Sequence, residues 1–240
     1  MAVEMGPSPE MYLKSLFELA RGGAPVPISA LADRLGHSVV SATEMVHRLQ
    51  RRGMVAHQPY RGARLTPAGA DHARALLRRH RLWERFLTDE LQLPWESVHD
   101  LACQLEHAVG EEVTDALDRR LGSPATCPHG NPIPRTGAAA SPSARSLADL
   151  QPGERANLVA VHPESGPVLT YLAQHGLVPG ADVRLESIEP TDGLRVVRTA
   201  AGAVALGPEL AARLRLAPAA GERSPVGAAK PSGTKRPRSG

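Results

Sequence analysis

Helical spacing of apolar residues dominates the first third of the chain. A first helix is predicted to begin with Ser8 as N-cap and Pro9 at its first position, and Gly22-Gly23 ends it. Its apolar residues recur every three or four positions, at Tyr12, Leu13, Leu16, Phe17 and Ala20. Two further helices are predicted over residues 29–35 and 38–53, separated by Gly36. Two short helices joined by a tight turn that contains glycine indicate a helix-turn-helix.

The pattern after Gly53 changes from helical to extended. Residues 54–58 and 63–66 flank a turn sequence, PYRG, so a hairpin is predicted here. A helix-turn-helix followed by a hairpin is a winged helix, and residues 1–74 are therefore predicted to form a DNA-binding domain. Thr66-Pro67 then starts a long helix that runs toward Leu91.

Residues 75–135 are predicted to be entirely helical. Pro94 breaks the long helix, a new helix follows Trp95, and helical spacing resumes after Gly110. The small and polar residues that follow favour a linker over residues 136–149.

The last third of the chain changes to the two-residue period of strands. Short strands are predicted over residues 157–161, 182–188, 194–199 and 203–206, with one helix over 169–175. The expected fold is thus mainly α, with a small SH3-like β-barrel over residues 150–216. Residues 217–240 are rich in Pro, Ala, Gly and Ser and end in basic residues, which is typical of a disordered basic tail.

Composition limits the class of protein. The hydrophobic content of 42% is sufficient for packed cores. Two cysteines in 240 residues exclude a disulfide scaffold and favour a reducing compartment. Because the chain has no apolar run near ~20 residues and no signal peptide, we expect a cytoplasmic protein without membrane spans.

Charge is distributed unevenly along the chain. Residues 48–85 contain ten Arg and two acidic residues, whereas residues 86–118 contain nine Asp or Glu and no Lys or Arg. The first segment suits a nucleic acid and the second suits cations. Two unrelated solvated helix faces would give the same composition.

Metal-ligand spacing is clearest in the run HDLACQLEH, residues 99–107. On a helix, His99, Cys103, Glu106 and His107 would share one side, and thiolate, carboxylate and imidazole all bind first-row metals. His80 and Glu84, four residues apart, share a face of the long helix. If the two helices pack antiparallel, one metal position would use Cys103, Glu106 and His107, and the other His80, Glu84 and His99. Taken singly, such a His/Glu pair is usually exposed on the helix surface and binds no metal. A single cysteine is more often a small, buried apolar residue than a metal ligand.

A second pair of potential ligands, Cys127 and His129, lies in the sequence TCPHG. A structural zinc site needs four ligands, so this pair is interpreted as a turn between helices.

The third predicted helix would read DNA, because the second helix of a helix-turn-helix enters the major groove by its N-terminal part. Its residues Arg48, Arg51 and Arg52 would meet phosphates, with Arg61 and Arg64 on the wing. A protein-binding winged helix remains the alternative. The side chains near the start of the helix that can contact bases are Ser38, Val40, Ser41, Thr43 and Glu44.

Four runs of the chain resemble the iron-dependent (diphtheria toxin) repressor family. They are EMYLKSLFELA (10–20), RRHRLWERFLTDELQLP (78–94), VHDLACQLEHAVGEEV (98–113) and PHGNPIP (128–134). The resemblance covers residues 8–135 almost without gaps and residues 150–216 more loosely. It implies a primary, activating metal site of Met11, Cys103, Glu106 and His107, and an ancillary site of His80, Glu84 and His99. The family's ancillary site also takes a Glu and a Gln from the third domain; residues 159–165 have no clean match, and His162 and Glu164 are candidates.

The resemblance also implies a function. We expect a homodimeric repressor, dimerised by the helical domain, that binds double-stranded operator DNA when Fe(II) is bound and controls iron homeostasis genes. Sulfur from Met11 and Cys103 favours Fe(II) over Mn(II), although Mn(II), Co(II), Ni(II) or Zn(II) should substitute in vitro. Glu44 stands where close relatives have Gln, so the operator sequence should differ. The alternatives are a manganese- or zinc-responsive regulator of the same fold and, from another class, a metalloenzyme with Glu106 as base.

Overall fold

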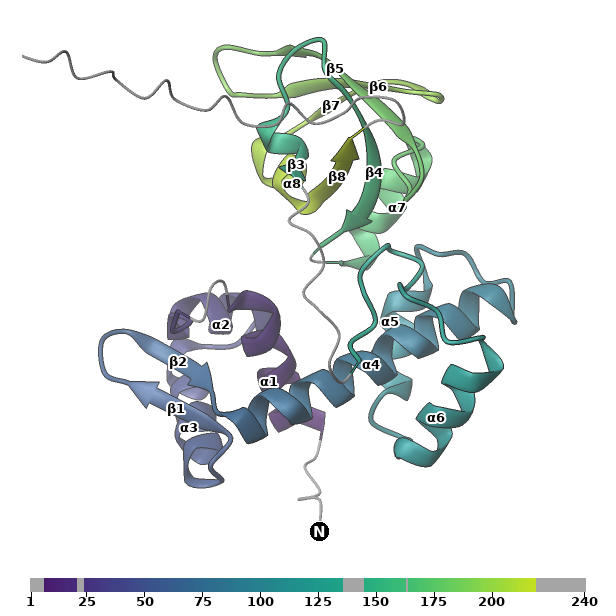
Figure 1. The fold of residues 1–240 in the computed structure, drawn as a ribbon. Helices are drawn as coiled ribbons and strands as arrows, with labels where there is room; N and C mark the ends of the chain where they lie inside the picture. Colours follow the sequence, from purple (N-terminus) through teal and green to yellow (C-terminus); the bar gives the residue numbers. More distant parts are fainter. Residues whose placement is uncertain (1–6, 21–23, 136–144, 163, 219–240) are drawn as a thin grey trace, which may run out of the picture.

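A computed structural model describes residues 7–20, 24–135, 145–162 and 164–218. Its three domains lie around one long helix, α4 (Pro67–Asp89), which runs from the first domain into the second (Figure 1). The first domain contains α1 (Pro7–Leu19), α2 (Ile28–Leu35), α3 (Val39–Arg51), β1 (Val55–Gln58) and β2 (Gly62–Leu65). This order confirms the predicted winged helix. The first helix begins at Pro7, so Ser8 lies inside it and is not its N-cap.

The helix-turn-helix forms for the local reasons that the sequence indicates. Gly36 adopts a left-handed conformation with φ of 66° and ends α2. The Ser38 side chain then caps α3 by accepting a hydrogen bond of 3.1 Å from the backbone N–H of Ser41. The inner faces of the helices share one core, which includes Leu13, Leu16, Leu31, Ala42, Val46 and Leu49.

The wing is an antiparallel hairpin in which Val55 pairs with Leu65 and Gln58 with Gly62. Gly62 has φ of 112°, and a Cβ atom there would lie 2.0 Å from the carbonyl oxygen of Val26. The absence of a side chain lets Val26 and Ala63 exchange backbone hydrogen bonds of 2.7 and 2.9 Å. The wing is thereby fixed to the segment that precedes α2.

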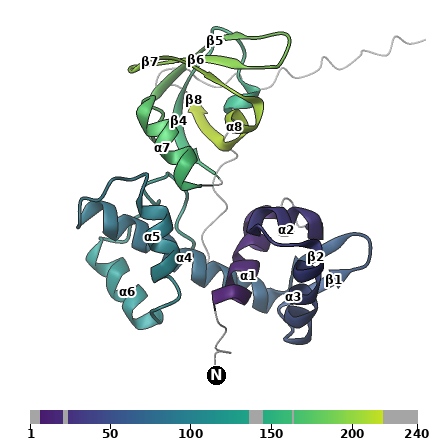
Figure 2. The ribbon, with the colours of Figure 1, turned by 180° about the vertical axis from the view of Figure 1, so that it is seen from behind.

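The second domain is helical, as predicted, but shares α4 with the first. The boundary predicted at residue 74 falls inside α4, which contacts α1 near its start and α5 and α6 farther along. Thr66 caps α4 by accepting a 3.1 Å hydrogen bond from the backbone N–H of Gly69. The other helices are α5 (Val98–Leu105) and α6 (Glu111–Arg120), seen from behind in Figure 2.

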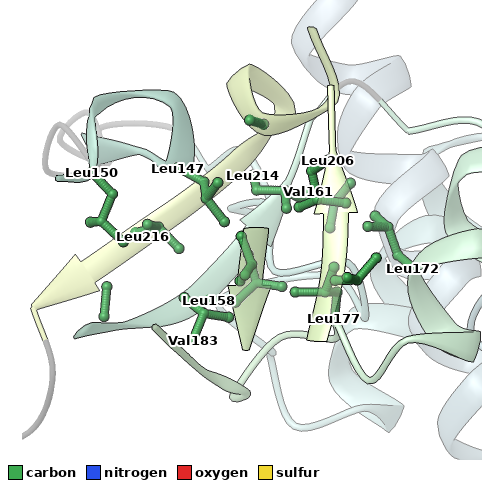
Figure 3. Packing of buried hydrophobic residues seen from close by; sticks show 14 of the residues in the cluster. Leu147, Leu150, Leu158, Val161, Leu172, Leu177, Val183, Leu206, Leu214 and Leu216 are labelled. Carbon is green, nitrogen blue, oxygen red and sulfur yellow. The ribbon is translucent and has the colours of Figure 1, made fainter. Parts of the chain in front are cut away.

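The third domain is a six-stranded antiparallel sheet in the order β3-β8-β4-β5-β6-β7. Figure 3 shows its core, in which Leu158 of β4, Leu172 of α7 and Leu214 of β8 meet. Its elements are β3 (Arg145–Ser146), a 3-10 turn (Leu147–Asp149), β4 (Arg155–Val161), α7 (Gly166–Gln174), β5 (Asp182–Ile188), β6 (Arg195–Thr199), β7 (Gly202–Leu206), α8 (Pro208–Arg213) and β8 (Leu214–Pro218).

The ends of this domain differ from the prediction. Residues 145–149 of the predicted linker belong to the domain, because Ser146 pairs with Arg215 and Leu147 is fully buried in the core. The strand β8, absent from the prediction, extends to Pro218, past the predicted start of the tail at 217. The rest of the predicted linker (136–144) and tail (219–240) lies outside the described residues.

The third domain contacts the helical domain through the segment 127–131. The backbone N–H of Val161 donates to the His129 carbonyl (3.0 Å), and the Asn131 amide donates to the Val161 carbonyl (2.7 Å). A Cβ atom on Gly130 would lie 1.8 Å from the Val159 carbonyl oxygen. This close approach requires glycine at position 130. Within the described residues, no helix is long and apolar enough to cross a membrane.

We predict that Asp118→Asn lowers the free energy of unfolding by about 1–3 kcal/mol. The Asp118 carboxylate accepts hydrogen bonds of 2.8 Å from Arg135 and Arg78, which lower its pKa. Because the pKa is lowered in the fold, this stabilisation is present above the carboxyl's unfolded value and lost as the pH falls through the folded value. Urea unfolding at pH 7 and at acidic pH measures both effects.

The matched control is Glu186→Gln, which removes an exposed pair with Arg198 and should leave stability almost unchanged. Equal losses in the two variants would contradict the role given to Asp118.

Candidate metal centre and DNA interface

The Glu84 carboxylate lies at the centre of a cluster of histidines. Its Oε1 atom is 2.9 Å from His80 Nε2, 3.1 Å from His99 Nδ1 and 3.2 Å from His129 Nδ1. The side chain is fully buried, and its Oε2 atom has no hydrogen-bond partner among the described residues. Burial raises the pKa of Glu84, but the charges of His80 and His129 outweigh burial and hold it well below its usual range. An unpartnered, buried carboxylate oxygen is what a metal ligand presents to an ion.

Cys103 lies with the histidines of the predicted ancillary site. Its Sγ atom is 4.0 Å from His80 Nδ1 and 3.9 Å from His99 Nε2, and these three side chains can meet at one ion. Burial raises the pKa of Cys103, but the hydrogen bonds with His80 and His99 lower it to about 6. The side chain is therefore a thiolate at neutral pH, the form that binds metals.

Glu106 and His107 lie just beyond the end of α5 and face α1. Glu106 is the C-cap of the helix and fully buried; its Oε1 atom is 3.4 Å from His107 Nε2, and its Oε2 atom is 2.6 Å from His80 Nδ1. His80 therefore lies between the two predicted sites, which form one continuous cluster. Glu106 keeps a helical conformation, and its backbone N–H donates to the Ala102 carbonyl at 2.9 Å, so Cys103 and Glu106 share the last turn of α5 and both contact His80.

Helix α1 contributes charged side chains to this cluster. Lys14 Nζ lies 2.8 Å from Glu106 Oε2, and Glu10 Oε2 lies 2.5 Å from His107 Nδ1. Burial raises the pKa of Glu10, but hydrogen bonds to His107 and His72 lower it to about 2. Met11 follows Glu10 on the helix and is half-buried. Glu10 and Lys14 are a helical turn apart, and with Glu18 they form a four-residue repeat that sequence reasoning did not use.

The residues Cys127 and His129 belong to a second cluster with Glu84 and Glu164. All four side chains are buried, and one potential ligand atom from each lies within 4.8 Å of the others. From the sequence, Cys127 and His129 are interpreted as a turn, because only two potential ligands are found there. In the fold, Glu84 of α4 and Glu164 of the third domain lie beside them. Glu164 is held there by a 2.6 Å hydrogen bond from Asn131.

The predicted DNA-reading residues lie on the outer side of α3. Ser38, Val40, Ser41, Glu44, Arg48 and Arg51 are all exposed, and Val40 retains 69% of its accessible surface. Thr43 is half-buried, and its hydroxyl donates to the Val39 carbonyl at 2.7 Å. A groove of about 910 Å³ with four Arg side chains lies elsewhere, between α4 and α6, but those arginines contact carboxylates or a carbonyl.

Three protein-family models match the chain, one for each domain and in the same order. The models matched are "Iron dependent repressor, N-terminal DNA binding domain" over residues 4–63, "Iron dependent repressor, metal binding and dimerisation domain" over 66–135, and "FeoA domain" over 145–218. The iron-dependent repressor IdeR of Mycobacterium tuberculosis is 34% identical over 207 residues, which cover 81% of this chain and 90% of that protein. The chain belongs to the iron-dependent repressor family.

Other similar proteins match parts or nearly all of this chain. The diphtheria toxin repressor of Corynebacterium jeikeium is 42% identical over 125 residues, which span 52% of each protein. A manganese-dependent transcriptional repressor in complex with manganese has 32% identity and a TM-score of 0.77, covering 87% of this chain and 98% of that one. ScaR with bound Zn²⁺ has 28% identity and a TM-score of 0.76, covering 88% and 99%. The family resemblance and the three-part fold are thus confirmed.

For this member of the iron-dependent repressor family we predict that the two cysteines differ in reactivity. In metal-free protein, alkylation of half-buried Cys103 should increase with pH around a midpoint of about 6. Burial, followed by the charges of Glu84 and Glu164, raises the pKa of Cys127, so this fully buried thiol should stay unmodified while the protein is folded. Mass spectrometry after iodoacetamide pulses measures both rates.

The variant His99→Ala should move the Cys103 midpoint upward, toward the ordinary thiol value of about 8.5, because one stabilising hydrogen bond is lost. An unchanged midpoint would contradict the contact between these two side chains.

Proposed function

We propose that this repressor is activated by Fe(II) and then binds operator DNA as a homodimer, controlling iron homeostasis genes in the cytoplasm. The observation that carries the proposal is the contact between α1 and the metal-ligand cluster. Glu10 and Lys14 of the DNA-binding domain meet His107 and Glu106 of the helical domain. An ion bound at Glu106 and His107 would therefore change the forces on α1.

Helix α1 can carry this change to the DNA-reading helix. On one side it faces the cluster, and on the other Leu13 and Leu16 pack in the same core as Val46 and Leu49 of α3. Metal binding that favours one position of α1 would favour the corresponding position of α3, and DNA binding would in turn strengthen metal binding.

The proposed primary site keeps the predicted ligands Met11, Cys103, Glu106 and His107. Sulfur, imidazole and carboxylate together suit Fe(II), with Mn(II), Co(II), Ni(II) or Zn(II) as substitutes in vitro. Fe(II) is favoured by the relatives that are named iron-dependent, whereas solved relatives named for manganese keep a manganese-responsive regulator as the second candidate.

We assign the ancillary site to Glu84, Cys127, His129 and Glu164, with His80 and His99 beside it. These four donors satisfy the ligand number that closed metal sites require, and their burial excludes water. Glu164 then occupies the place of the third-domain carboxylate that the family implies. The predicted set of His80, Glu84 and His99 is the alternative ligand set for this ion.

Dimerisation is assigned to the helical domain. Leu91, Leu101 and Val113 retain 53%, 38% and 42% of their accessible surfaces, and a match to a metal-binding and dimerisation domain covers residues 66–135. The domain match supports the assignment, and these exposed apolar residues are candidates for the interface. A metalloenzyme is not favoured, because the relatives are named as repressors.

Metal-dependent DNA binding tests the proposal. By anaerobic fluorescence anisotropy on DNA from the gene's own upstream region, Fe(II) should give tight binding that a chelator reverses. Met11→Ala and Cys103→Ala should abolish the metal effect and leave the dimer intact. Glu209→Gln, on an exposed position of α8, is the matched control and should behave as wild type. Equal binding with and without metal would exclude metal activation.

The DNA contacts make a separate prediction. Arg51→Ala should weaken binding to all sequences and reduce the salt dependence by about one ion per protomer, because it removes a phosphate contact. Glu44→Gln should instead change the preferred base at one position, by about 1–3 kcal/mol, because an amide can donate to adenine and a carboxylate cannot. Binding titrations over a set of operator variants and salt concentrations separate the two effects; a uniform loss for Glu44→Gln would contradict base reading.

A further inference from the structure

A third group of potential ligands lies between α1 and the third domain. Glu18, near the end of α1, comes together with His162 and Glu164, which follow β4. One potential ligand atom from each lies within 4.8 Å of the others. The Glu18 side chain is 7% exposed and that of Glu164 is 3% exposed. The sequence indicates only His162 and Glu164 as candidate ligands, because Glu18 lies more than 140 positions before them along the chain.

The polar contacts around this group leave ligand atoms available. Arg34 donates to Glu18 Oε2 at 3.1 Å, and Asn131 donates to Glu164 Oε1 at 2.6 Å. Within the described residues, no hydrogen bond is found at Glu18 Oε1 or Glu164 Oε2, so both atoms remain for another partner. His162 Nδ1 is buried, lies 3.4 Å from Glu164 Oε2, and makes no well-aligned hydrogen bond with the described residues.

A cation satisfies this arrangement better than the imidazole alone. Two buried carboxylates close together repel each other, and one imidazole N–H can donate to only one of them. A divalent ion would neutralise both carboxylates and accept the lone pair of His162 Nδ1 at the same time. Two carboxylates and one imidazole, with water at the remaining positions, suit a first-row ion such as Fe(II) or Mn(II).

We propose that Glu18, His162 and Glu164 bind a divalent first-row cation, and that Glu164 bridges it to the ion held by Glu84, Cys127 and His129. A carboxylate has two oxygens and can bind two ions at once. The bridging part rests on the ancillary site proposed above; the cation position itself rests on the Glu18 group.

This cation position would join the third domain directly to the DNA-binding domain. Glu18 lies on α1, whose other face packs in the core with α3, whereas His162 and Glu164 follow β4 of the third domain. A cation bound at this position would hold the third domain against α1. Its binding free energy would then stabilise the position of α1 that is competent for DNA binding. The third domain would thus respond to metal at two positions, the Glu84 cluster and the Glu18 group, both of which include Glu164.

Cobalt stoichiometry on the full chain tests the proposal without DNA. Co(II) bound per protomer is measured by anaerobic equilibrium dialysis, together with the near-ultraviolet thiolate-to-cobalt absorption. Glu18→Gln and His162→Ala should each bind one Co(II) fewer than wild type and keep the thiolate absorption, because Cys103 and Cys127 retain their ions. Thermal unfolding confirms that each variant is folded, and His162→Gln replaces His162→Ala if the latter is not.

The control variant is Arg34→Gln, which removes the ion-pair partner of Glu18 and leaves all three proposed ligands in place. It should bind as many Co(II) ions as wild type. If Glu18→Gln and Arg34→Gln lose the same ion, Glu18 acts only through its ion pair, and the proposal is wrong. Full stoichiometry in Glu18→Gln and His162→Ala also overturns it.

Small-angle X-ray scattering gives a second readout. With Co(II) bound, Glu18→Gln should have a larger radius of gyration than wild type, because the third domain is released from α1. Identical scattering of the two proteins contradicts the coupling. Co(II)-dependent operator binding by wild type, measured in parallel, tests the proposed repressor function separately. A negative result in either experiment therefore contradicts only the proposal that the experiment tests.

Discussion

The burial of three carboxylates constrains the arrangement of all three domains. Glu84 and Glu106 are fully buried and Glu164 is 4% exposed, so each requires positive charge or hydrogen-bond donors from its surroundings. Those partners come from α1, α4, α5, the segment 127–131 and the third domain. Since no single element supplies enough partners, the elements must meet at this point. Imidazoles and Lys14 supply part of the positive charge, and bound metal would supply the rest.

Helix α1 is the element through which the cluster can reach DNA. Its two faces have different functions: Leu13 and Leu16 pack in the core of the winged helix, while Glu10 and Lys14 contact His107 and Glu106. A rigid helix that belongs to two packing environments transmits a change in one to the other. The proposed response to metal would need no distant pathway, because α3 packs directly against the helix that contacts the ligand cluster.

The segment 127–131 has the corresponding role for the third domain. Cys127 and His129 face Glu84, Asn131 holds Glu164, and Gly130 lets β4 approach closely. The same short segment thus contains two potential metal ligands and the docking contacts of the domain. Under the proposed assignment, an ion bound here would affect both the ligand cluster and the docking of the third domain.

The sequence alone determined the elements and their chemistry, because caps, turns and periodicity act over a few residues. The turn at Gly36, the N-cap Ser38 and the hairpin pattern of residues 54–66 predicted a winged helix, and the spacing of His80, Glu84 and the run 99–107 predicted a metal-binding helical domain. Only the tertiary structure decided which potential ligands lie close together. Helical spacing predicts that side chains share a face, but not which element packs against that face. Cys103 lies with His80 and His99 because α5 packs against α4, and Glu106 contacts the same His80. Cys127 and His129, two ligands in the sequence, become part of a group of four because long-range packing brings Glu84 and Glu164 to them.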